Sequence, residues 1–197
     1  LEKSTRGVTL KPADVFDAVR GVHRRIKGSY AVVALIAGHG LLAFRDPFGI
    51  RPLCVGRNGS GAVMVASESV ALEGNGFELI RDVMPGEALF VDMQGQMHFQ
   101  QCADKVSHNP CIFEFVYLAR PDSVLDGISV YQARLNLGKT LAKRLVSTVP
   151  PNEIDVVIPI PESSRPSAME LAQLLGLPYR EGFVKNRYVG RTFIMPG

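Results

Sequence analysis

Three cations, a tyrosine and a glycine are concentrated in residues 185–192 (KNRYVGRT). Arg187 and Arg191 offer planar, permanently charged, bidentate donors for phosphate, and Lys185 adds a compact point charge. Gly190 allows backbone conformations that a Cβ would forbid. A solvated basic loop is the alternative interpretation, because short basic runs are common. The pattern is typical of a segment that closes over a polyanion.

A short apolar run precedes this segment, at residues 154–160 (IDVVIPI), and predicts a buried parallel strand. The sequence PESSRP follows at residues 161–166, and residues 167–175 have the pattern of an amphipathic helix in which Pro166 suits the first position. Ser163, Ser164 and Arg165 would then lie at the carboxyl end of a strand and beside a helix N-terminus. Open α/β sheets bind anions there, although an ordinary turn with a serine N-cap is the alternative.

Four blocks of the sequence resemble the amidophosphoribosyltransferases, the glutamine-dependent enzymes that open purine biosynthesis. Residues 182–194 (GFVKNRYVGRTFI) resemble the flexible loop of that family. Residues 45–52 (RDPFGIRP) and 66–69 (ASES) resemble the late part of its glutaminase domain, and residues 115–123 (FVYLARPDS) resemble the start of its phosphoribosyltransferase domain. The resemblance runs from about Gly28 to the last residue.

The resemblance implies an α/β chain with two parts. Residues 1–100 would be the C-terminal part of a class II glutamine amidotransferase domain, an N-terminal-nucleophile α/β/β/α sandwich. Residues 101–110 would be a linker, and residues 111–197 would be the first part of a type I phosphoribosyltransferase domain with a doubly wound sheet. The family's catalytic nucleophile is an N-terminal cysteine, whereas this chain begins with Leu1. We therefore expect an internal fragment that contains no catalytic residue and is inactive alone.

The resemblance also implies binding roles for particular side chains. Tyr117 and Tyr188 would line the path of ammonia, although tyrosines are more often ordinary packing residues. Ser163 would be a Mg²⁺ ligand, since Mg²⁺ takes few protein ligands and relies on phosphates and water. The roles of Arg165 and Pro166 stay open, because this part of the loop varies among relatives. Phosphoribosyl pyrophosphate or a nucleotide would contact Glu162, Ser163, Ser164, Lys185, Arg187 and Arg191.

The implied reaction makes 5-phosphoribosylamine from phosphoribosyl pyrophosphate and glutamine, the first step of de novo purine (IMP) biosynthesis. A cysteine thiolate releases ammonia from glutamine, and ammonia then displaces pyrophosphate from carbon 1 of the ribose. The implied partners are these two substrates, purine nucleotide inhibitors and further copies of the protein in a homo-oligomer. Two alternatives stay open: another class II amidotransferase, and a non-catalytic nucleotide-sensing module.

Composition narrows the class of protein. The net charge of +3 is small, and the aromatic residues do not alternate with cations, which argues against nucleic acid as a partner. No apolar stretch approaches the roughly 18 residues of a membrane span, so we expect no membrane partner. A cytoplasmic location is implied mainly by the resemblance. Cys54, Cys102 and Cys111 have neither a disulfide nor a metal spacing, and an iron–sulfur cluster is not expected because it needs four thiolates. A buried free thiol is expected at Cys111.

Hydrophobic periodicity and turn residues predict the remaining elements. Residues 13–26 have one apolar stripe and predict a helix. Hairpins are predicted for residues 30–36 with 41–44, 53–55 with 62–66, and 88–92 with 96–100. A second helix is predicted to follow Ser129, with Gln132 completing a capping box. Arg45 and Asp46, beside a Pro-Phe-Gly turn, could be a solvated surface pair. The resemblance implies instead that they brace the glutaminase fold near its site, a role that is structural rather than catalytic.

Overall fold

The computed structural model describes residues 10–150, 153–186 and 188. Contacts within the chain divide it into two compact units. Unit 1 comprises Leu1–Glu114 and Leu118–Ser129, and unit 2 comprises Phe115–Tyr117 and Val130–Gly197. Among the described residues, no helix is long and apolar enough to cross a membrane.

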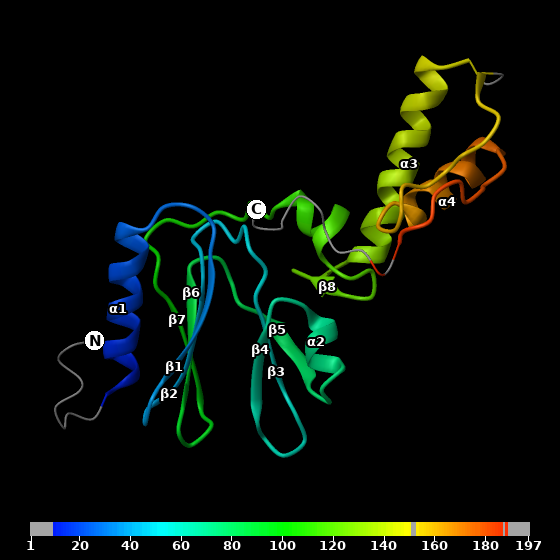
Figure 1. Cartoon of the computed structure of the whole chain (residues 1–197). Coiled ribbons are helices and arrows are strands. Elements are labelled where there is room, and N and C mark those ends of the chain that lie inside the picture. The colour runs from blue at the N-terminus through cyan, green and yellow to red at the C-terminus, as the bar shows by residue number, and fades with distance from the viewer. Residues whose placement is uncertain (1–9, 151–152, 187, 189–197) are drawn as a thin grey trace. The chain divides into compact units, whose positions relative to one another are not determined.

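Unit 1 is built from two antiparallel sheets, each covered by a helix on its outer face (Figure 1). The four-stranded sheet has the order β1-β2-β6-β7, and the three-stranded sheet has the order β4-β3-β5. The helix α1 covers the first sheet and the short helix α2 packs on the second. The elements are α1 (Pro12–Arg25), β1 (Ala31–Ile36), β2 (Gly40–Arg45), β3 (Cys54–Arg57), β4 (Val63–Ala66), α2 (Ser69–Glu73), β5 (Glu78–Asp82), β6 (Glu87–Asp92) and β7 (Met97–Gln101).

Alternation along the central strands explains why the two sheets stack. In β2, Leu42 and Phe44 point to α1, where they join Val15 and Val19 in one core cluster. Ala43, between them in sequence, belongs to a second cluster with residues of the three-stranded sheet. Successive side chains of a strand point to opposite faces, so one strand contributes to two cores. The predicted α/β/β/α sandwich is therefore confirmed.

The three predicted hairpins of unit 1 are confirmed, with registers that join β1 to β2, β3 to β4, and β6 to β7. Gly40 is required where β2 begins, because its φ is 150° and a Cβ there would lie 2.1 Å from the Val91 carbonyl oxygen. The helix α2 and the strand β5 were not predicted. The sequence of β5, ELIRD, places two apolar residues side by side between polar ones, so it lacks the polar–apolar alternation by which a strand is recognised.

A short hairpin completes unit 1. A π-helical turn, η1 (Glu114–Leu118), precedes the strands β8 (Val124–Leu125) and β9 (Ile128–Ser129). Residues 101–110, the predicted linker, hydrogen-bond to earlier parts of unit 1: the Ser107 N–H donates to the Pro47 carbonyl at 3.1 Å and the Asn109 N–H to the Phe48 carbonyl at 2.8 Å. The predicted domain limits at residues 100 and 111 stay a prediction.

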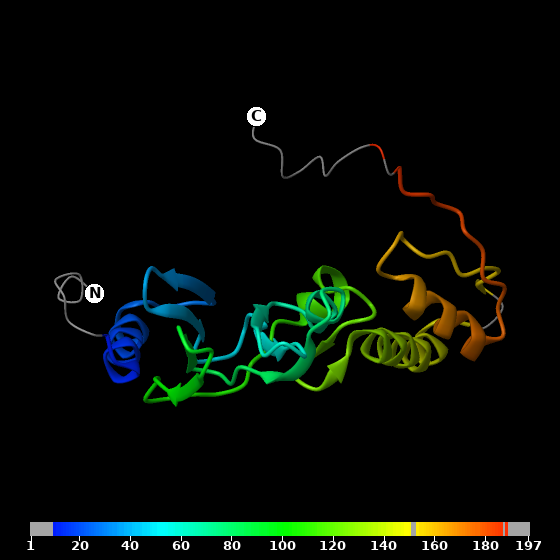
Figure 2. The same cartoon turned by 90° about the horizontal axis from the view of Figure 1, so that it is seen from below.

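Unit 2 is organised by two packed helices, α3 (Val130–Thr148) and α4 (Arg165–Leu175), which lie side by side (Figure 2). Both predicted helices are thus confirmed. Gly138 permits their close approach, since a Cβ there would lie 2.4 Å from the Ser167 carbonyl oxygen. One cluster of buried residues between the helices consists of Ala142, Val157, Ala168, Leu171 and Ala172.

The strand predicted at residues 154–160 is wrong in extent. Within the described part of unit 2, parallel pairing is limited to one bridge between Val157 and Tyr179. The Val157 N–H donates to the Pro178 carbonyl at 2.9 Å, and the Arg180 N–H donates to the Val157 carbonyl at 3.1 Å. Pro159 and Pro161 have no N–H, so the ladder cannot continue through them.

Candidate functional site

Two loops of unit 2 meet at the carboxyl end of the Val157–Tyr179 bridge. Because the two segments run parallel, the residues that follow each of them emerge at the same edge. These are residues 158–165 after Val157 and residues 180–186 after Tyr179. The meeting is direct, since Arg165 Nη2 lies 3.3 Å from Glu181 Oε1. Open α/β folds bind ligands at the corresponding edge.

The first loop brings the predicted hydroxyl groups to the start of α4. Ser164 occupies the N-cap position, but its side chain makes no capping hydrogen bond. Its Oγ donates instead to the Ile160 carbonyl, at 2.5 Å. Ser163 is half-buried, Glu162 is exposed, and the Pro161–Glu162 peptide bond is cis. The first loop therefore leaves the N-terminal N–H groups of α4 without a side-chain cap from Ser164.

Arg165 is the loop residue whose role the sequence left open. It is the first residue of α4, and its side chain is 39 % exposed against 47 % for that of Glu181. Its Nε atom is buried and has no hydrogen-bond partner among the described residues. The Arg165–Glu181 pair was missed by sequence reasoning, because the two residues belong to separate segments and nothing in their spacing links them.

The predicted cations are only partly placed. Lys185 is exposed and follows Glu181 on the second loop. Arg187 and Arg191 lie outside the described residues. The structure therefore brings Glu162, Ser163 and Ser164 to the edge that Glu181 also reaches, and it leaves the contribution of the three cations a prediction.

The two predicted channel tyrosines lie in unit 2. Tyr117 is half-exposed within η1, and the side chain of Tyr188 is 99 % exposed. The Tyr188 N–H donates to Asn186 Oδ1 at 2.9 Å. Tyr188 is thus not a packing residue among the described residues. The channel role of both tyrosines stays a prediction.

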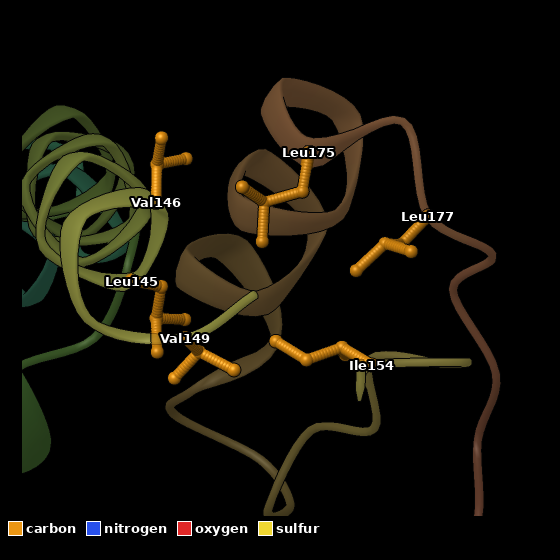
Figure 3. A pocket seen from close by; sticks show the side chains of 6 residues that line it. All are labelled: Leu145, Val146, Val149, Ile154, Leu175 and Leu177. Atoms are coloured by element: carbon orange, nitrogen blue, oxygen red, sulfur yellow. The ribbon is translucent and has the colours of Figure 1, made fainter. Parts of the chain in front are cut away.

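Unit 2 also contains a small pocket of about 50 Å³, which Figure 3 shows from close by. The side chains around it come from the C-terminal parts of α3 and α4 and from the segments that follow these helices. All of them are aliphatic, so the pocket offers no group that could bind an anion. Its lining residues are Leu145, Val146, Val149, Ile154, Leu175 and Leu177.

Arg45 and Asp46 are structural, as the sequence predicted. Arg45 is 1 % exposed and donates to the carbonyl groups of Gly49, Arg51 and Val83 at 2.6–2.9 Å. Asp46 is fully buried and accepts three backbone N–H groups of the Pro-Phe-Gly turn and the residues after it.

Arg45 also binds Asp126 in the turn of the β8–β9 hairpin, with two contacts of 2.7 and 2.8 Å. Burial opposes ionisation of Asp126, but the hydrogen bonds and charge of Arg45 outweigh it and lower the pKa of this carboxyl. The neighbouring Asp82 has a raised pKa, first because of burial and then because of the Asp126 charge. Sequence reasoning missed both carboxylates, since Asp126 lies 81 positions from Arg45.

The sequence was compared with models of protein families and with curated proteins. Residues 8–74 match the family described as "Glutamine amidotransferase domain". Three relatives named amidophosphoribosyltransferase are 56 % identical (Pasteurella multocida), 54 % identical (Escherichia coli K12) and 52 % identical (Saccharomyces cerevisiae). The alignments cover 93–98 % of this chain but only 37–39 % of each relative.

Two solved structures are also similar. One is a glutamine phosphoribosylpyrophosphate amidotransferase from B. subtilis complexed with ADP and GMP, with 38 % identity and a TM-score of 0.79 over 99 % of this chain and 40 % of that one. The other is described as the allosteric regulatory enzyme of purine biosynthesis, with 34 % identity and a TM-score of 0.75 over 100 % of this chain and 44 % of that one. Over nearly its whole length, the chain is therefore homologous to a part, about 38 % in length, of the amidophosphoribosyltransferases.

Proposed function

We propose that the chain is part of a glutamine-dependent amidophosphoribosyltransferase that makes 5-phosphoribosylamine in the first step of purine biosynthesis. The observation that carries this proposal is the 52–56 % identity to enzymes of that name across nearly all of the chain. The meeting of the loops at residues 158–165 and 180–186 supports it, because they form one edge beside a helix N-terminus.

The second half-reaction needs a site that stabilises a departing pyrophosphate and excludes water. In our proposal, Ser163 donates its hydroxyl hydrogen bond to a phosphate oxygen, and Ser164 does so after its O–H leaves the Ile160 carbonyl. The N–H groups at the start of α4 add their dipoles. Lys185, Arg187 and Arg191 would supply positive charge from the second loop and its continuation. Glu162 would orient a donor group of the substrate.

A magnesium ion is the cofactor that we propose. No group of three or more His, Cys, Asp or Glu side chains suited to a metal occurs in the described ranges. A half-buried hydroxyl at Ser163 is compatible with Mg²⁺, because this ion keeps several waters and binds mainly through substrate phosphates. When bound, Mg²⁺ would neutralise charge on the pyrophosphate group.

The remaining partners follow from the relatives and are proposals too. Ammonia would pass along Tyr117 and Tyr188, so that glutamine hydrolysis and ribose amination are linked. Purine nucleotides would inhibit by occupying the same phosphate-binding groups, a proposal supported by ADP and GMP in the B. subtilis structure. We further propose a cytoplasmic homo-oligomer. The 197 residues alone are expected to turn over neither glutamine nor phosphoribosyl pyrophosphate.

The test is an assay of the whole protein that contains this chain, purified from its source. We expect glutamine-dependent release of pyrophosphate from phosphoribosyl pyrophosphate. Arg191→Ala should reduce this activity by at least about tenfold, because a charged donor to the leaving group is removed, while glutaminase activity measured without phosphoribosyl pyrophosphate is retained. Arg180→Ala is the matched control, since Arg180 is an exposed cation of the same segment outside the proposed ligand set. A whole protein that binds nucleotides without any turnover would favour a sensing module instead.

A further inference from the structure

Arg165 and Glu181 form an ion pair at the edge where the proposed function places the phosphates of the substrate. We propose that Glu181 is an internal counter-ion of Arg165, and that a pyrophosphate group displaces it when the group binds to Arg165. The pair would then set the affinity of the site for pyrophosphate. This inference rests on the proposed function, because it concerns the regulation of the same site.

The contact between the two side chains is suited to exchange. Nη2 of Arg165 contacts one oxygen of Glu181 at 3.3 Å, whereas the exposed pair Arg120–Asp122 has two contacts of 3.0 and 2.8 Å. A single, longer contact leaves the planar fork of the guanidinium available to another ligand. A phosphate group matches that fork with two parallel hydrogen bonds.

The buried Nε atom of Arg165 points to the same exchange. Among the described residues it has no hydrogen-bond partner, although it is shielded from solvent. A buried donor without an acceptor is unfavourable, so an oxygen that reaches Nε relieves this cost. Glu181 does not satisfy this donor, because its carboxylate contacts Nη2 instead. A ligand with several adjacent oxygens could contact Nε and one Nη together.

The ion pair is weak enough for pyrophosphate to displace the Glu181 carboxylate from Arg165. Exposed ion pairs typically change an equilibrium constant by only about 1.4- to 5-fold. Both members of this pair are more than a third exposed, so the lower part of that range applies. Pyrophosphate carries several negative charges and competes readily with a single carboxylate. Glu162 and Glu181 would still repel it, while Lys185 attracts it, so the acidic partner reduces the affinity without abolishing it.

The recognised group is a pyrophosphate, which occurs both in phosphoribosyl pyrophosphate and as the free product. The experiment uses inorganic pyrophosphate as the probe, with Mg²⁺, in calorimetric titrations of the whole protein. We expect Glu181→Gln to tighten binding by roughly 1.4- to threefold, because Arg165 loses its competitor. Arg165→Ala should weaken binding, and Glu181→Gln should have no effect in the Arg165→Ala background.

Glu170→Gln is the matched control for the change in net charge. Glu170 lies on α4, next to the same loop in sequence, and its ion pair is with Lys139 at 3.8 Å rather than with Arg165. We expect pyrophosphate affinity to be unchanged in this variant. If Glu170→Gln tightens binding as much as Glu181→Gln, or if Glu181→Gln acts equally with and without Arg165, the counter-ion role is excluded.

A whole protein with no affinity for pyrophosphate and no amidophosphoribosyltransferase activity would overturn the proposed function together with this inference. A protein that binds pyrophosphate and is active, but whose affinity does not respond to Glu181→Gln, would overturn the counter-ion role alone. Arg165→Lys separates the loss of positive charge from the loss of the planar guanidinium, because lysine retains only the charge. We expect its pyrophosphate affinity to lie between those of the unsubstituted protein and Arg165→Ala.

Discussion

The three thiols differ in burial, and this difference predicts their reactivity. Burial, followed by the charge of Asp82, raises the pKa of Cys54 to about 12. Burial also raises the pKa of Cys102 to about 11, against a smaller lowering by Arg20. The thiolate is the reactive form, so at pH 8 both groups are almost entirely in the unreactive thiol form. We expect iodoacetamide to modify the half-buried Cys111 first, as measured by mass spectrometry of the native protein.

The control for this prediction is the same labelling in denaturant, where all three cysteines should react at similar rates. Labelling of Cys54 at the rate of Cys111 in the native protein would contradict the burial argument. The sequence predicted a buried thiol at Cys111, whereas the structure places it half-buried. Burial of a single cysteine depends on which segments pack over it, and the local pattern does not contain that information.

Arg45 shows which part of a residue's role can be inferred from sequence. The turn at residues 46–49 alone allowed a solvated surface pair, whereas the resemblance implied that Arg45 and Asp46 brace the fold; their burial supports the bracing role. Asp126 is the carboxylate that neutralises the charge of Arg45. The sequence could not link the two residues, which are 81 positions apart. Contacts between distant segments are fixed by the fold, so the local sequence predicts the role of a residue better than its partners.

At the level of elements, the Arg45–Asp126 pair fixes the β8–β9 hairpin to the rest of unit 1. Asp126 has φ of 49°, and its side chain is only 13 % exposed. We expect Asp126→Asn to reduce the stability of unit 1 by about 3 kcal/mol, because it leaves the charge of buried Arg45 without its partner. Hydrogen exchange in peptides covering β8 and β9 would measure this loss.

Asp122→Asn is the matched control for the hairpin. Asp122 also receives two contacts from an arginine in the same part of the chain, but both side chains are about half or more exposed. We expect no measurable change in exchange, because exposed pairs are screened by solvent. Equal effects of the two substitutions would show that burial of Arg45 does not determine the strength of its pair.

The free energy of unfolding of unit 1 should depend on pH through two neighbouring carboxyl groups, Asp82 and Asp126, that act in opposite directions. The pKa of Asp82 is raised in the folded state, so ionised Asp82 reduces stability above that pKa and the penalty disappears as the pH falls below it. The pKa of Asp126 is lowered, so its contribution is complete above about pH 4 and is lost as the pH falls through the lowered value. Asp82→Asn should therefore increase stability at pH 7 and have less effect as the pH approaches 4. Urea unfolding at several pH values measures both; destabilisation by Asp82→Asn at pH 7 would refute the assignment.

The elements that the sequence predicted well have strong local signals. Hairpins were found because glycine marks their turns, and helices because their apolar residues recur at the helical period. Residues 154–160 misled the prediction, because a β-branched run was weighed more heavily than Pro159 within it. The strand at Glu78–Asp82 was missed because it lacks a β-branched apolar run. It lies at the edge of its sheet, where polar residues such as Glu78 can remain exposed.

At the scale of the whole molecule, the two units have separate clusters of buried residues. The sandwich has two clusters that include Phe16, Phe44, Phe90 and Leu89. The cluster between the helices of unit 2 consists of three alanines, one valine and one leucine, side chains that are smaller than the phenylalanines of the sandwich. The resemblance seen in the sequence implied two parts joined at residues 101–110. Separate cores predict that a substitution confined to one unit leaves the stability of the other unchanged.

Two glycines within helices test this independence. Gly138 in α3 faces the Ser167 carbonyl oxygen, and Gly138→Ala would place a methyl group 2.4 Å from that atom. We expect a loss of about 2 kcal/mol in unit 2, since the packed helices must separate. A Cβ added at Gly21 in α1 would meet no atom within 4 Å, so Gly21→Ala should stabilise unit 1 by about 0.5–1 kcal/mol through helix propensity.

Hydrogen exchange at increasing urea concentration distinguishes the two units in one experiment. Gly138→Ala should shift the unfolding of α4 peptides to lower urea while β6 peptides are unaffected, and Gly21→Ala should shift only peptides of unit 1, in the opposite direction. If Gly138→Ala moved both sets of peptides together, the sandwich and the helical unit would unfold as one cooperative body. The two substitutions are expected to shift the urea concentration of unfolding in opposite directions. A general effect of adding a methyl group to a helix would shift it in the same direction in both variants.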